Sequence, residues 1–153
     1  MKRKMVIGML TMGMVLCGAM TVSAESDGYV ISASHGYGAV EHWEIKTIGM
    51  QDAAKDLGVE FNYKYADGDL QQEVADIENF VEMGTNYIIV GPCNSEGIVP
   101  VIEEAQDKGV AVGTCDIGIE GVDVASFVSS DNYGIGEIAA DYIGTEMNLS
   151  LIH

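Results

Sequence analysis

The sequence predicts an α/β fold built on a doubly wound parallel sheet. Short runs rich in β-branched residues alternate with stretches that carry apolar residues three and four positions apart. The repeat is roughly 25 to 30 residues long, which is typical of strand and helix units in a parallel sheet. The clearest unit spans 85–117, where Tyr87 to Val90 has the composition of a strand buried on both faces. We therefore expect helices on both faces of the sheet.

The first predicted strand begins at Tyr29 and ends in a glycine-rich turn. A helix is expected from about Ala39 to Leu57, and Gly58 should end it in a left-handed conformation. The second strand should run from Val59 to Tyr65. The residues expected on the buried side of the helix are Val40, Trp43, Thr47, Met50, Ala54 and Leu57, and those on one face of the strand are Val59, Phe61, Tyr63 and Tyr65.

A second helix should begin after Asp69, whose side chain can cap it. Gln72 stands three residues later, so the pair has the spacing of a capping box. Gly84 should end this helix before the central strand. Its expected buried stripe consists of Leu70, Val74, Ile77 and Val81.

Polar residues follow two strands of the central unit. Gly91 and Pro92 should end the strand that begins at Tyr87, and Asn94 or Ser95 can then cap a helix with Ile98, Val101, Ile102 and Ala105 on its buried side. Val110 to Thr114 should form the next parallel strand. Ligands of open α/β sheets bind beyond the carboxyl ends of the strands. Cys93, Asn94, Cys115 and Asp116 are expected at that edge.

The last predicted elements are a short strand from Val124 to Val128 and a helix from about Gly134 to Met147. A further strand should follow this helix if the alternation continues, so the chain reads as truncated. No repeat or low-complexity linker interrupts the pattern.

Residues 1–24 have the pattern of a secretory signal peptide. A basic start at Lys2 to Lys4 precedes a mostly apolar run, and Val22 to Ala24 fits a small-residue cleavage site. The apolar run is too short for a membrane span. We therefore expect an exported protein, periplasmic or at the cell surface.

The chain is strongly acidic, with 7 basic and 24 acidic residues. Three of the bases and none of the acids lie in residues 1–24, so the rest carries 4 bases and 24 acids, a net charge of −20. Such a surface repels nucleic acid and anionic lipid. The acids are scattered, which indicates solvated helix faces instead of an acidic interaction tail.

Several classes of chemistry fit the sequence poorly. GYGAVE, from Gly36 to Glu41, has a carboxylate where a dinucleotide fingerprint requires Gly or Ala, and GIGEIA, from Gly134, follows its strand too late. No Cys or His pair has metal-ligand spacing. Cys93 and Cys115 could form a disulfide, but small buried thiols fit neighbouring parallel strands better. We expect no catalytic residue, no metal and no cofactor.

A neutral, hydroxylated ligand fits better. Sugars bind through an aromatic face and through carboxylates or amides that accept from and donate to hydroxyl groups. Trp43 stands in the first turn of a helix near the ligand edge, although its place in the apolar stripe fits a core residue equally well. Asp116 follows a strand directly, and capping a turn is its alternative role.

Four segments carry a resemblance to a known family. DLGVEF, FVEMGTNYIIVGP, KGVAVGTCD and SSDNYGIGEIAADYI resemble the amino-terminal half of periplasmic sugar-binding proteins of the ribose-binding type, over most of residues 29–146. The resemblance implies one flavodoxin-like lobe of a type I periplasmic binding protein, a monomer that closes on a monosaccharide. It also implies delivery to the membrane subunits of an ABC importer, and in some members to a chemotaxis receptor.

The same resemblance assigns residues. His42 and Trp43 match the aromatic pair that stacks on the sugar, and Asp116 matches the carboxylate that accepts its hydroxyls. Asn94 is included as a further ligand contact at the strand edge, and Asp131 and Asn132 match hinge and capping residues. Ile117 and Gly91 depart from the arginine and asparagine that the family often has there, which affects the identity of the sugar.

The resemblance divides the chain into residues 25–127, the ligand-binding lobe, and residues 128–153, the crossover and first helix of an incomplete second lobe. A lone lobe should bind sugar weakly or not at all. Three alternatives stay open: a binding protein for a non-sugar molecule such as an autoinducer, polyol or nucleoside; the effector domain of a repressor, which would carry a basic helix-turn-helix first; and an exported flavodoxin-like enzyme.

Overall fold

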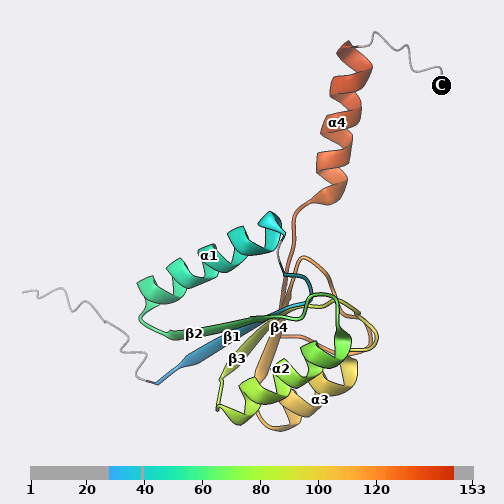
Figure 1. The fold of residues 1–153 in the computed structure, drawn as a ribbon. Coiled ribbons are helices and arrows are strands. Elements are labelled where there is room, and N and C mark those ends of the chain that lie inside the picture. The colour runs from blue at the N-terminus through green and yellow to red at the C-terminus, as the bar shows by residue number, and fades with distance from the viewer. Residues whose placement is uncertain (1–27, 39, 147–153) are drawn as a thin grey trace, which may run out of the picture.

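The protein is described here by a computed structural model, in which residues 28–38 and 40–146 can be described (Figure 1). The predicted signal peptide, the strand expected after Met147 and the end of the chain lie outside these residues. Five parallel strands form one sheet in the order β2-β1-β3-β4-β5. They are β1 (Val30–His35), β2 (Glu60–Tyr65), β3 (Tyr87–Gly91), β4 (Ala111–Cys115) and β5 (Ser126–Val128).

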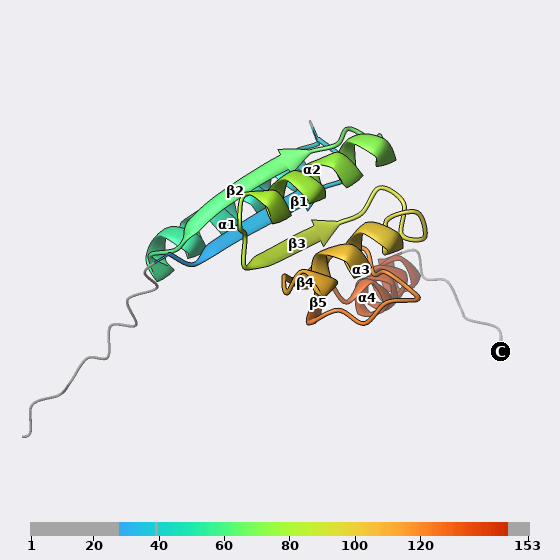
Figure 2. The same ribbon diagram turned by 90° about the horizontal axis from the view of Figure 1, so that it is seen from below.

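Helices lie on both faces of the sheet, which confirms the predicted doubly wound fold. One face carries α1 (Glu41–Leu57), and the other carries α2 (Leu70–Glu82) and α3 (Val99–Asp107), which pack side by side (Figures 1 and 2). The last helix, α4 (Asn132–Glu146), leads away from the sheet (Figure 1). Among the described residues, no helix is both long and apolar enough to cross a lipid bilayer.

The main core lies between the sheet and the α2 and α3 helices. Ile88 of β3 pairs in register with Ser32 of β1 and Val112 of β4, so their side chains share one face of the sheet. Each fully buried Ile or Val side chain contributes roughly 1.5–3 kcal/mol relative to an exposed one. The buried members of this cluster are Ile77, Phe80, Ile88, Val90, Ile98, Val101, Ile102, Ala105, Val110 and Val112.

The α1 helix buries fewer residues than the sequence predicts. Trp43, Thr47 and Ala54 are buried, but Val40 is 53% exposed and Leu57 is 65% exposed. The prediction was wrong at both ends because Val40 stands before the helix and Leu57 is its last residue. Gly58 has φ 68° and its amide donates back to the helix, as predicted.

The α2 helix is capped by Asp69, but not through a capping box. The Asp69 carboxylate accepts hydrogen bonds from the amides of Gln71 and Gln72 at 2.9 and 3.3 Å. The Asp69 amide already donates to the carbonyl of Ala66, and the Gln72 side chain donates to Asp76 at 2.9 Å instead. The predicted stripe also missed Phe80, Glu73 and Asp76, which are buried.

The later elements differ from the prediction at their starts. Asn94 closes a turn before α3 instead of capping it, because its side-chain oxygen accepts from the amides of Glu96 and Gly97 at 3.2 and 2.8 Å. The β5 strand begins at Ser126 instead of Val124, and α4 begins at Asn132 instead of Gly134.

Candidate ligand-binding site

Polar side chains from two elements meet at the carboxyl edge of the sheet. Asp116 directly follows β4, and His42 and Lys46 lie on the first two turns of α1, the helix that follows β1. The chain runs from β1 outward to β2 and then returns to β3 on the other side of β1. This reversal opens a crevice next to β1, where ligands bind in doubly wound folds. We call His42, Lys46 and Asp116 the polar triad.

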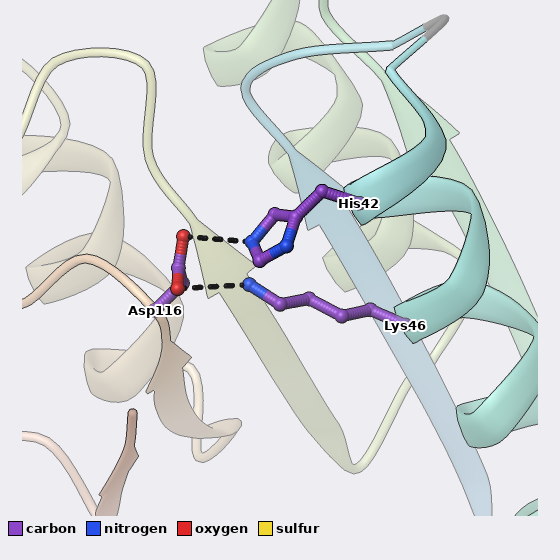
Figure 3. A network of polar contacts seen from close by, with 3 residues as sticks. All are labelled: His42, Lys46 and Asp116. Atoms are coloured by element: carbon purple, nitrogen blue, oxygen red, sulfur yellow. Dashed lines mark hydrogen bonds and ion pairs between the residues drawn. The ribbon is translucent and has the colours of Figure 1, made fainter. Parts of the chain in front are cut away.

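The triad is held together by two contacts to one carboxylate (Figure 3). His42 Nε2 lies 3.2 Å from Oδ2 of Asp116, and Lys46 Nζ lies 3.1 Å from Oδ1. Partial burial alone would raise the pKa of Asp116, but the hydrogen bonds and charges of Lys46 and His42 outweigh it and hold the pKa below its usual value. Asp116 is therefore ionised at neutral pH, and its side chain is 26% exposed.

The backbone of Asp116 is also constrained. Its φ is 68°, in the left-handed region, and its amide donates to the carbonyl of Val128 at 2.8 Å. Aspartate tolerates this conformation better than most residues, at a cost of roughly 1–2 kcal/mol. The carboxylate points towards His42 and Lys46 of α1 (Figure 3). Strain of this kind clusters at ligand clamps.

Lys46 is the one member of the triad that was not predicted from the sequence as a site residue. Its ammonium lies 3.1 Å from Asp116 and 4.3 Å from the centroid of the Trp43 ring. The available signal was helical spacing, since Lys46 stands four residues after His42 and three after Trp43. One face of α1 therefore carries all three side chains.

Trp43 lies below the triad and is largely part of the core. Its side chain is only 5% exposed, and its ring centroid is 5.2 Å from that of His35. Burial, and secondly the charge of Lys46, lower the pKa of His35 to about 4, so this histidine is neutral at pH 7. The burial supports the core interpretation of Trp43, and a contact with ligand would be limited to the edge of its ring.

A groove of about 510 Å³ continues from the triad between α1 and the strands β3, β4 and β5. Lys46 and Asp116 stand in its wall, and most of the remaining lining is apolar. Its other lining residues are Gly49, Met50, Ala53, Tyr87, Ile89, Thr114, Cys115, Ser126, Val128, Ser129 and Ser130.

Comparison with known proteins identifies the family. The profile of the periplasmic binding protein domain matches residues 36–150, which include the triad and the whole sheet after β1. The chain belongs to the periplasmic binding protein family. The family is one of binding proteins, not of enzymes.

Sugar-binding proteins are among the relatives of this periplasmic binding protein chain. It is 30% identical over 133 residues to the D-xylose-binding periplasmic protein of Haemophilus influenzae, covering 85% of this chain and 40% of that protein. It is 30% identical over 99 residues to the ribose import binding protein of Bacillus subtilis, covering 65% and 32%. The chain thus spans well under half the length of these relatives.

A solved structure shows the same fold. It is an ABC transporter solute binding protein from Clostridium phytofermentans with bound β-D-glucose. The TM-score is 0.73 at 26% identity, over 78% of this chain and 37% of that one. The likeness confirms the predicted type I periplasmic binding fold.

The other predicted site residues lie apart from the triad. The side-chain oxygen of Asn94 is already used by its own turn, and Asn94 has no described contact with the triad. Asp131 accepts a hydrogen bond from the amide of Gly134 at 2.9 Å and so caps α4, which begins at Asn132. Ligand contact by Asn94 and a hinge at Asp131 and Asn132 remain predictions.

Both described cysteines are free thiols, so the disulfide left open by the sequence is not formed. Burial, and secondly a hydrogen bond to Glu73, raise the pKa of Cys93 to about 12. Burial also raises the pKa of Cys115. Neither thiol is ionised at pH 7, which makes both poor nucleophiles. Among the described residues, no group of three acidic, His or Cys side chains is arranged to hold a metal ion.

Proposed function

We propose that this chain provides the ligand-binding edge of an exported protein that captures a monosaccharide for an ABC importer. The observation that carries the proposal is the polar triad at the carboxyl edge of the sheet, in a chain of the periplasmic binding protein family. The relatives named for xylose and ribose support a sugar as the ligand.

The triad suits a neutral ligand rich in hydroxyl groups. Asp116 can accept hydrogen bonds from sugar hydroxyls, and Lys46 and His42 can donate to sugar oxygens. The contacts of His42 and Lys46 with Asp116 hold the carboxylate in place before ligand arrives, which reduces the entropy lost on binding. Because the carboxylate already has a cationic partner in Lys46, a neutral ligand leaves no unpaired charge at the edge.

The proposed export and delivery rest on the family and on the predicted signal peptide. The basic, apolar and small-residue regions of the predicted signal peptide stand in the order that secretion requires. Transfer to importer membrane subunits follows the names of the relatives. Docking on a chemotaxis receptor, a monomeric state and a lobe boundary near residue 127 are further predictions.

The test is a chemical-shift titration of the full chain with D-xylose, D-ribose and D-glucose. Of the two outcomes expected from the sequence, weak binding or none, the proposed site predicts weak binding, with a Kd on the order of millimolar, because the chain spans well under half the length of its relatives. Saturable shifts should centre on His42, Lys46 and Asp116. Shifts that centre elsewhere, or none with any of the three sugars, would contradict the proposed site.

Asp116→Asn tests the role of the carboxylate. The change removes a charged acceptor, and hydrogen bonds to charged groups contribute about 1.5–3 kcal/mol. We therefore expect the Kd to rise about 10-fold or more. Asp123→Asn is the matched control, because it removes the same charge at an exposed position away from the triad. Equal effects of the two variants would show that overall charge, and not the site, governs binding.

A further inference from the structure

Gly91 is the last residue of β3 and lies against the outer edge of the Trp43 ring. A Cβ atom at this position would stand 2.5 Å from both Cζ3 and Cη2 of Trp43, closer than real Cβ contacts come. It would also stand 3.5 Å from the carbonyl oxygen of Cys115. The indole ring therefore occupies the space that a side chain at residue 91 would need.

Glycine is required at this position for space and not for conformation. Gly91 is not among the glycines with positive φ, and it pairs in register with His35 of β1 as an ordinary strand residue. Any amino acid could adopt this backbone. A larger residue would, however, displace the Trp43 ring from its position.

The ring has little freedom to move elsewhere. His35 stands on one side with its centroid 5.2 Å away, and His35 is itself fully buried against Tyr65. The Lys46 ammonium lies over the ring at 4.3 Å. Because Lys46 lies over the ring, a ring displaced from residue 91 also changes its contact with the ammonium, which is held 3.1 Å from Asp116.

We propose that Gly91 is a positioning residue that sets ligand selectivity through Trp43. The missing side chain at residue 91 lets the indole sink onto the end of β3, which leaves Lys46 room to lie over the ring and reach Asp116. The edge is deeper as a result, and it admits a larger sugar than a raised ring would allow. This inference rests on the proposed function, since selectivity has meaning only if the edge binds sugar.

The first experiment reads the ring position without ligand. Trp43 is the only tryptophan of the chain, so its fluorescence reports on one site. In the full chain, Gly91→Ala should shift the emission maximum to longer wavelength as the ring becomes exposed. Gly136→Ala is the control, because a Cβ there meets no atom within 4 Å. Unchanged emission in Gly91→Ala would overturn the proposal.

A double-mutant cycle covers the case in which Gly91→Ala folds poorly. Trp43→Leu replaces the ring by a smaller apolar side chain and so makes room at residue 91. We expect the drop in the urea midpoint caused by Gly91→Ala to be at least halved in the Trp43→Leu background. Equal drops in both backgrounds would show that the two residues do not interlock, and the proposal would fail.

The last experiment measures selectivity. The full chain and Gly91→Ala are each titrated with D-glucose and D-xylose, and for each sugar the Kd of the variant is divided by that of the full chain. A raised ring should weaken binding of the hexose at least threefold more than binding of the pentose. Equal weakening of both sugars would overturn the selectivity role. Absence of binding by the unchanged chain would refute the proposed function, and with it this role, while the fluorescence shift would still establish the interlock.

Discussion

Replacing Lys46 by methionine should change both the stability of the lobe and the acidity of Asp116. The substitution keeps an unbranched side chain but removes the ammonium that lies 3.1 Å from Asp116 and 4.3 Å from the Trp43 centroid. The ion pair contributes about 0.2–1 kcal/mol, and the contact with the ring contributes about 0.5–2 kcal/mol. We therefore expect the free energy of unfolding at pH 7 to fall by about 1–2 kcal/mol.

The pKa of Asp116 gives a sharper readout. Because Lys46 helps to hold this pKa below its usual value of 3.8, it should rise in Lys46→Met. A carboxyl group whose pKa is lowered by folding stabilises the fold fully above its unfolded pKa, and this contribution is lost as the pH falls through the folded value. The difference in stability between the native chain and Lys46→Met should therefore narrow below about pH 3.8.

The assay combines urea denaturation at several pH values with a carbon NMR titration of the Asp116 carboxyl group. Lys55→Met is the matched control, because Lys55 is exposed in the last turn of the same helix. The control should leave the Asp116 pKa unchanged. If Lys46→Met also leaves it unchanged, the reasoning about the triad is wrong.

Two further substitutions test the elements that support the site. His35→Phe should remove one pH-dependent contribution to stability. Because the pKa of His35 falls from 6.5 to about 4 on folding, the native chain should lose about 3 kcal/mol of stability as the pH falls from 7 to 4. Urea midpoints across that range should fall more steeply for the native chain than for His35→Phe, and parallel slopes would contradict the assignment. Asp69→Ala should lower the free energy of unfolding by about 1 kcal/mol, because it removes the cap of α2. Asp107→Ala is the control, because Asp107 is the last residue of α3 and does not cap the start of a helix. The nearer Asp67 is unsuitable as a control, because its side chain accepts a hydrogen bond from the Gly38 amide.

The order of elements could be predicted from the sequence because each unit carries a local signal. The run from Tyr87 to Val90 forms β3, and Gly58 ends α1 as expected. The type of each described element was therefore correct, and the differences lie at the ends. The boundaries of helices and strands depend on competing local hydrogen bonds. The Asp69 amide donates to the carbonyl of Ala66, which excludes the capping box.

The candidate site could be predicted only in part. Asp116 was found because it follows a strand at the carboxyl edge, a position that topology alone makes significant. Lys46 was missed because a lysine on a helix is most often a solvated surface residue. Its importance arises from the approach of α1 to the end of β4, which joins residues 70 positions apart and has no local signature.

Trp43 shows a further limit of sequence reading. The apolar stripe and the resemblance to sugar-binding proteins gave it two roles with equal support. The structure shows that the ring is buried and that it occupies the space that a side chain at residue 91 would need. A single position cannot be interpreted when its packing partner is distant in the chain.

The hydrogen bond from the Asp116 amide to the carbonyl of Val128 connects two regions of the chain. Val128 is the last residue of β5, and residues 129–131 then lead to α4 (Figure 1). The residue expected to contact the ligand is thus tethered to the start of the segment that departs from the sheet. Any displacement of Asp116 on binding acts directly on the first peptide group of that connection, with no intervening side chain to absorb it.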